Sequence, residues 1–291
     1  MARGKNILVP VDFSETSMVK IDEAIFIAKI VSADVTLMHV IETYSQNSSI
    51  AKEKYEQEGR DEAIEKVVNE KLDEIISKIK EKNIVFHKKI AFGKIYQAII
   101  DGAESVNARL LVMGTTSTSR FGKILGTNTA RVVRAAKCPV ITMRDKSRVF
   151  KFKNILLPLD FSKETRQKIK IAIETAHQFG SQIHVVSVTT SGDEFHVGKL
   201  RAQLAVVKQQ IKEAGVPFTA KLIKGKKISE TILHYAPVVN ADCIIIMTQQ
   251  EVGFVEMMVG TSAEQIMNNS MIPVISVRPS KGKEVYFNIF G

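Results

Sequence analysis

The chain has 291 residues, long enough for two ordinary domains, and 45% of these residues are hydrophobic while 25% are charged. This composition excludes a disordered chain, and no apolar run approaches the length of a membrane-spanning helix, so we expect a cytoplasmic protein without membrane spans. The net charge of +10 is interleaved with acidic residues instead of forming a basic arm, which argues against a nucleic-acid partner.

The first predicted strand, at 6–11, is followed by the motif Asp-Phe-Ser and by a helix that Ser14 is placed to cap. The predicted elements that follow are a strand at 34–41, a long amphipathic helix at about 60–82, a strand at 84–92, a helix opening at Gly93, a strand at 108–114, a helix from about Thr127 and a strand at 139–144. The strands are rich in Val, Ile and Leu and alternate with helices. This pattern indicates a parallel sheet covered by helices on both faces.

The whole pattern occurs twice. The stretch KNILVPVDFSETS at 5–17 returns as KNILLPLDFSKET at 153–165. The stretch GTNTARVVRAAKCPVITMR at 126–144 returns as GTSAEQIMNNSMIPVISVRP at 260–279. Both ends of the unit recur in the same order, so chance similarity between two unrelated domains is a poor explanation.

We therefore expect two tandem α/β domains, a first copy at 1–147 and a second copy at 148–291. Each is predicted to be doubly wound, with a five-stranded parallel sheet in the order 3-2-1-4-5. In such a sheet, ligands bind beyond the carboxyl ends of the strands, between the first and the fourth strand. Those strands lead into Asp12 and Gly114 in the first copy, and a carboxylate at that place suits the hydroxyl groups of a ribose.

The stretch GTTSTSRFGKILGTNT at 114–129 has the features of a phosphate-binding loop. It leads into a helix whose amide groups and positive end favour an anion. Gly126 lets the backbone approach a phosphate closely, and Thr127 can cap the helix or donate its hydroxyl. Arg120 and Lys123 could supply charge. The alternative is a surface loop that ends in an ordinary helix cap.

The motifs NILVPVDFS, LMHV, LLVMGTTS and GTNTARVVRAAKCPVITMR, with their second copies, resemble the universal stress proteins in their tandem two-domain form. The resemblance covers nearly the whole chain and implies the doubly wound fold and a stress-response role. Some members of that family bind ATP through a pattern of Gly, two residues, Gly, nine residues, Gly, then Ser or Thr. Others lack the pattern and bind none, so a nucleotide-free protein-protein interaction module of the same fold is the alternative.

The resemblance implies a site for ATP, or for ADP or AMP, with Mg²⁺ as an optional companion. The residues it implies are an adenine wall of Pro10, Val11, Val40 and Met113, adenosine contacts at Asp12 and Gly114, and phosphate contacts at Gly126, Thr127 and Asn128. Ser117 replaces the second glycine of the pattern, and eight residues, instead of nine, separate it from Gly126. A serine forced into a left-handed backbone costs about 1–2 kcal/mol, which would weaken binding.

The second copy departs further from the pattern. Aligned by sequence, Thr248 and Glu251 stand where the first copy has Gly114 and Ser117, although Asp160 remains. A carboxylate close to a phosphate costs up to about 4 kcal/mol at an effective dielectric near 20. We therefore expect the second copy to be degenerate and to bind no ATP.

No catalytic residue is predicted, and at most slow ATP hydrolysis is expected. The chain has no Gly-x-Ser-x-Gly elbow, Walker loop or Cys-x-x-Cys motif. The histidines lack the spacing of metal ligands, so no metal site of protein ligands is predicted, and His39 is interpreted as a pocket-wall residue. The resemblance also implies pairing through the last strand of each copy, as an intramolecular pseudo-dimer, with a homodimer as a further option.

Overall fold

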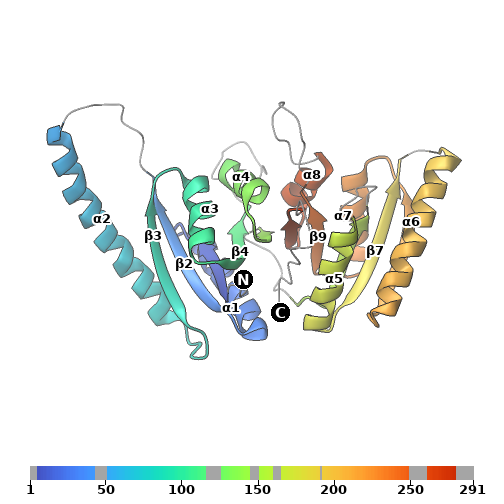
Figure 1. Cartoon of the computed structure of the whole chain (residues 1–291), viewed down its shortest axis with the longest axis horizontal. Coiled ribbons are helices and arrows are strands. Elements are labelled where there is room, and N and C mark those ends of the chain that lie inside the picture. Colours follow the sequence, from blue (N-terminus) through green and yellow to red (C-terminus); the bar gives the residue numbers. More distant parts are fainter. Residues whose placement is uncertain are drawn as a thin grey trace. The chain divides into compact units, whose positions relative to one another are not determined.

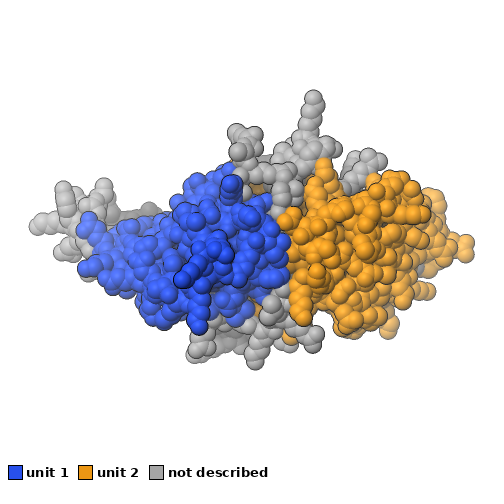
Figure 2. Space-filling model, turned by 90° about the horizontal axis from the view of Figure 1, so that it is seen from below, with its two compact units in different colours: residues 1–112 blue, residues 113–291 orange. Residues whose placement is uncertain are grey.

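The computed structural model describes residues 5–42, 51–115, 126–144, 151–159, 165–190, 192–248 and 261–279. The chain divides into two compact units, residues 1–112 and 113–291 (Figure 2). The division falls inside a strand of the first copy. The last helix and strand of the first copy are therefore grouped with the second copy, and each unit is described by itself.

Unit 1 is a parallel sheet with helices packed on it (Figure 1). Its elements are β1 (Asn6–Pro10), α1 (Glu15–Val31), β2 (Asp34–Ile41), α2 (Ala51–Lys78), β3 (Phe86–Phe92), α3 (Ile95–Ser105) and β4 (Ala108–Gly114), whose last two residues belong to unit 2. The strand order is β3-β2-β1-β4, and every one of these neighbours is parallel. Ile7, Leu8 and Val9 of β1 are fully buried, as expected for a strand covered on both faces.

Several boundaries in unit 1 differ from the sequence prediction, and two of them have a clear physical reason. Helix α2 begins at Ala51, earlier than predicted, because its first turns consist of good helix formers without an apolar stripe. Helix α3 begins at Ile95 and not at Gly93. Gly93 has a φ of +121°, and its N–H donates to the Ile41 carbonyl at 3.0 Å, so it forms the turn before the helix.

Unit 2 contains the rest of the described chain. Its elements are α4 (Thr127–Ala135), β5 (Val140–Met143), β6 (Asn154–Leu159), α5 (Thr165–Phe179), β7 (Gln182–Thr189), α6 (Glu194–Glu213), β8 (Phe218–Lys224), α7 (Ile228–Val238), β9 (Cys243–Met247), α8 (Thr261–Asn269) and β10 (Val274–Val277). The strand order is β5-β10-β9-β6-β7-β8. Strands β6 to β10 show the predicted 3-2-1-4-5 order, read from β8.

The α/β class and the doubly wound pattern are confirmed, but the strands of unit 2 are not all parallel. Strand β5 pairs antiparallel with β10, with Ile141 opposite Ile275. A last strand with an open edge would leave a row of backbone groups unpaired, and this pairing covers it. No helix within the described ranges is long and apolar enough to cross a membrane.

Candidate functional site

The predicted nucleotide residues fall into two groups, one in each unit. Unit 1 holds Pro10, Val11 and Asp12 at the end of β1 and Val40 near the end of β2. Unit 2 holds Met113 and Gly114 at the end of β4 and Gly126, Thr127 and Asn128 at the start of α4. Ser117, Arg120 and Lys123 lie outside the described residues.

The end of β1 is held by hydrogen bonds to β2. The Val11 N–H donates to the Met38 carbonyl at 2.8 Å, and the Nδ1–H of His39 donates to the Val11 carbonyl at 2.8 Å. Val11 is buried, so these bonds satisfy polar groups that solvent does not reach freely. His39 therefore lies against the predicted adenine wall and fixes the path of the chain toward Asp12.

Asp12 is exposed and is oriented by a local turn. Its Oδ1 accepts the Ser14 backbone N–H at 3.2 Å and the Ser14 hydroxyl at 2.6 Å. Ser14 occupies the N-cap position of α1, as predicted, but its side chain makes no capping hydrogen bond. The Ser14 hydroxyl donates its hydrogen bond to the Asp12 carboxylate instead. A carboxylate has about four acceptor sites, so the two bonds from Ser14 do not by themselves prevent it from accepting ligand hydroxyl groups.

Phe13 is a feature of this turn that sequence reasoning missed. Its φ is +61°, a left-handed conformation that is costly for an aromatic residue. The ring lies 4.5 Å from the His39 ring, between centroids, at an interplanar angle of 32°. On α2, the Lys71 Nζ is 5.2 Å from the Phe13 centroid. These contacts help to offset the backbone strain, and they form only in the folded chain.

In unit 2, two hydrogen bonds hold the start of α4 beside the end of β4. The Gly126 N–H donates to the Thr115 carbonyl at 3.2 Å, and the Thr129 hydroxyl donates to the Gly114 carbonyl at 3.0 Å. Thr129 was not among the predicted residues, although its place in the first turn of the helix could have suggested it. Gly126 has a φ of −54°, which any residue can adopt, so an advantage of glycine here lies in its missing side chain.

The start of α4 has the electrostatics of an anion site. The first amide groups of a helix have no acceptor within the helix, and the helix dipole makes this end positive. The first turn of α4 carries no acidic residue that would offset that charge. Thr127 is exposed and Asn128 is half-buried, so both side chains are reachable from solvent.

The strand register corrects the alignment between the two copies. Ile7 pairs with Leu110 in unit 1, and its repeat equivalent Ile155 pairs with Cys243 in unit 2. The Thr115 N–H also donates a hydrogen bond to the Met143 carbonyl, and the Thr248 N–H donates to the Val277 carbonyl, each at 2.9 Å. Thr248 therefore corresponds to Thr115, one residue away from the sequence alignment.

With this register, Met247 corresponds to Gly114. The second copy also has Ala263 in place of Thr129, so it lacks the hydroxyl that ties α4 to β4. Ser187 stands in place of His39 on β7, fully buried, and its Oγ has no hydrogen-bond partner in the described part of the chain. Asp160 and Glu251 lie outside the described residues.

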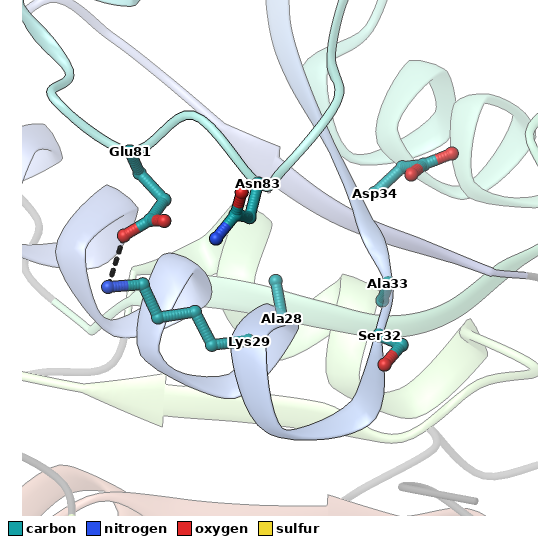
Figure 3. A pocket seen from close by; sticks show the side chains of 7 residues that line it. All are labelled: Ala28, Lys29, Ser32, Ala33, Asp34, Glu81 and Asn83. Carbon is teal, nitrogen blue, oxygen red and sulfur yellow. Dashed lines mark ion pairs between the residues drawn. The ribbon is translucent and has the colours of Figure 1, made fainter.

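A cavity of about 500 Å³ lies in unit 1 at the opposite, amino end of β2 (Figure 3). It is lined by Ala28, Lys29, Ser32, Ala33, Asp34, Glu81 and Asn83. Lys29 forms an ion pair with Glu81, which lowers the pKa of that carboxyl. Because ligands of doubly wound sheets bind at the carboxyl ends of the strands, this cavity is separate from the predicted nucleotide site.

Among the described residues, no group of three or more His, Cys, Asp or Glu side chains is arranged to hold a metal ion. His184 is a buried core histidine: it contacts the Thr219 hydroxyl at 2.8 Å and the Asn154 Oδ1 at 3.2 Å. Burial lowers the pKa of His184. Because Asn154 Oδ1 can only accept, the neutral ring donates its Nε2–H to it and accepts from Thr219 at Nδ1.

Comparison with known proteins gives matches over both copies. The model of the Universal stress protein family matches residues 4–144 and 151–278. Universal stress protein MJ0531 of Methanocaldococcus jannaschii is 31% identical over 145 residues, which are 48% of this chain and 82% of that protein.

Solved structures match as well. A universal stress protein from Archaeoglobus fulgidus DSM 4304 has a TM-score of 0.69 and 23% identity, with 96% of this chain and all of that chain covered. Another from Archaeoglobus fulgidus, in complex with dAMP, covers 44% of this chain and 99% of its own, at 20% identity and a TM-score of 0.37.

Proposed function

The chain belongs to the universal stress protein family, with two family domains in tandem, and from this premise we propose that it is a stress-response protein that binds an adenine nucleotide in its first copy. The nucleotide is ATP, or ADP or AMP. The residues proposed to bind it are Pro10, Val11, Asp12, Val40, Met113, Gly114, Ser117, Gly126, Thr127 and Asn128. A cytoplasmic location, domain boundaries at 147/148 and, at most, slow hydrolysis of ATP with Mg²⁺ are part of the same proposal.

One observation carries the proposal: the start of α4 is fastened to the end of β4. The bonds from Gly126 to Thr115 and from Thr129 to Gly114 hold a positive helix end next to the carboxyl end of a parallel strand. This is the place where doubly wound sheets bind ligands, and a helix start favours phosphate. The amide groups of Thr127 and Asn128 would donate to the phosphate oxygens.

Asp12 and the end of β1 supply the other part of the proposal. Strand β1 runs parallel to β4, with Leu8 beside Leu111. The Asp12 carboxylate, oriented by Ser14, would accept hydrogen bonds from ribose hydroxyls, and Val11 and Val40 would pack against the base. Charge-assisted hydrogen bonds of this kind are roughly twice as strong as neutral ones.

We propose that the second copy binds no ATP. Met247 in place of Gly114 introduces a side chain where the first copy has none, and Ala263 lacks the hydroxyl of Thr129. We further propose that the pairing of β5 with β10 serves as an intramolecular pseudo-dimer contact. Size-exclusion chromatography with light scattering should then give a monomer, whereas a homodimer would require another surface.

Calorimetric titration of the nucleotide-free protein with ATP and Mg²⁺ tests the proposal. One site per chain is expected. Two sites would contradict the degenerate second copy. No heat, together with no thermal shift at millimolar ATP, would overturn nucleotide binding, and the protein would then be pursued as the nucleotide-free interaction module.

A further inference from the structure

We propose that Arg278 of the second copy is a positioning residue for the phosphate-binding helix of the first copy, so that the degenerate half of the chain tunes the nucleotide affinity of the other half. The inference rests on the proposed function for its effect on ATP. Its structural part, the anchoring of α4, can be tested without any nucleotide. All the contacts involved lie within unit 2.

Arg278 follows β10 and reaches the carboxyl end of α4. Its Nη1 donates to the carbonyl of Ala135, the last residue of α4, at 3.0 Å. The last carbonyl groups of a helix have no partner within the helix, and this end carries a partial negative charge. A guanidinium group satisfies both the hydrogen-bond acceptor and the charge. Arg278 therefore acts as a carboxyl-end cap supplied by the other copy.

The antiparallel pairing of β5 with β10 brings Arg278 into place. Thr142 pairs with Val274, and its hydroxyl donates to the Val274 carbonyl at 3.4 Å. A second link joins Arg134 of α4 to Glu264 of α8, with 3.9 Å between Nη2 and Oε2. This ion pair is long and about one-third exposed, so its contribution is small and Arg278 is the stronger of these two links.

Helix α4 depends on such anchors because it has only nine residues. Helices of this length are marginal on their own in water and are held by their tertiary contacts. The amino end is tied to β4 by Thr129, and the carboxyl end is tied to the second copy by Arg278. If the carboxyl end frays, fewer chains present the amide groups of Thr127 and Asn128 correctly, and the apparent Kd for ATP rises in proportion.

The repeat itself supplies the matched control. Arg144 is the first-copy equivalent of Arg278, since both follow the last strand of their copy. Its Nη1 contacts the Met271 sulfur at 3.5 Å, in the turn after α8, and this contact does not involve α4. Substitution of either arginine removes the same charge from an equivalent place.

The experiment compares Arg278→Ala, Arg278→Lys and Arg144→Ala in the full chain, by calorimetry with ATP and Mg²⁺ and by amide hydrogen exchange without nucleotide. Arg278→Ala is expected to weaken ATP binding by about 3- to 10-fold, or about 0.7–1.4 kcal/mol. It should also speed exchange across 127–135. Arg278→Lys, which keeps a charged donor, should restore most of the affinity, and Arg144→Ala should leave the Kd within about 2-fold.

The outcomes are distinct. Unchanged ATP affinity in Arg278→Ala, or an equal loss in Arg144→Ala, would overturn the proposal. If the unaltered protein binds no ATP, the proposed function fails, and hydrogen exchange alone decides the anchor: equal exchange of α4 in the two alanine variants would overturn it. If Arg278→Ala does not fold, Arg278→Gln, which keeps a neutral donor, replaces it, with the same expected direction.

Discussion

The two copies of the repeat keep the same strand pairing but differ at the positions that would face a ligand. At the amino end of the sheet, the Thr36 hydroxyl donates to Asn6 in the first copy, and His184 donates to the equivalent Asn154 in the second. Both copies thus retain a polar pair across their first two strands. At the carboxyl end, His39 has become Ser187 and Gly114 has become Met247.

The comparison distinguishes residues that the fold requires from residues that nucleotide binding would require. A strand pair tolerates a change of partner as long as each buried polar group is satisfied. A phosphate site requires a small residue, a helix start and a fixed carboxylate together, so one large side chain can remove it. The following four predictions test this separation, from the largest expected effect to the smallest.

The largest effect is expected from Asp12→Ala, with Asp160→Ala as its equivalent in the second copy. Loss of a charged hydrogen-bond acceptor for the ribose should weaken ATP binding by about 10- to 100-fold, or about 1.5–3 kcal/mol. Asp160→Ala should leave the affinity unchanged. Calorimetry measures both, and an equal loss in the two variants would show that both copies bind nucleotide.

His39→Ala should destabilise the protein, whereas Ser187→Ala should not. His39→Ala removes the bond to the Val11 carbonyl and the contact with Phe13, and should destabilise the protein by about 1–3 kcal/mol. Ser187→Ala removes a buried hydroxyl whose Oγ has no hydrogen-bond partner in the described chain. It should be neutral or stabilise by up to about 1 kcal/mol. Thermal unfolding checks both, and a clear loss of stability in Ser187→Ala would reveal a partner for that hydroxyl.

Thr129→Ala places in the first copy the residue type that the second copy has at the equivalent position, Ala263. The loss of the hydrogen bond to Gly114 should cost about 1 kcal/mol and weaken ATP binding by about 5-fold. Thr129→Ser keeps the hydroxyl and is the control. If ATP titration gives the same Kd for Thr129→Ala as for the unaltered chain, this bond does not position the helix for binding.

The smallest effect is a pH dependence of stability from His184. Burial lowers the pKa of His184 in the folded chain, so the unfolded chain binds the proton more readily. Stability from this group is therefore full above the ordinary pKa of histidine, about 6.5, and is lost as the pH falls below it. His184→Thr, which copies the Thr36 arrangement, should flatten this slope. Denaturation at several pH values measures it, and an unchanged slope would assign it to other groups.

The fold could be predicted from the sequence because its strands are long apolar runs between strong helix signals. The predicted strands at 34–41 and 108–114 coincide with β2 and β4. The register between copies could not be predicted, because Met113 and Met247 look equivalent in sequence, while main-chain pairing makes Thr248 the equivalent of Thr115. The loop between the fourth strand and the next helix differs in length by one residue between the copies. Such a difference does not change the hydrophobic pattern of the strands or helices, so the sequence does not show where it lies.

Only part of the candidate site could be predicted from the sequence, for a related reason. Gly126 and Thr127 are adjacent in the sequence at the start of a predicted helix, so they could be recognised from the sequence alone. The left-handed Phe13, the role of Ser14 toward Asp12 and the contact of Arg278 with α4 depend on residues brought together by folding. Such contacts become visible only when the tertiary structure is known.

The pairing of β5 with β10 also has a consequence for the order of events during synthesis. Thr142 lies 132 residues before its partner Val274. At typical elongation rates the ribosome needs on the order of 10 s to make the intervening chain. The edge of β5 therefore cannot pair with β10 until almost the whole chain has been synthesised. Contacts of such long sequence separation form slowly, and a nascent or truncated chain would expose this edge to other molecules.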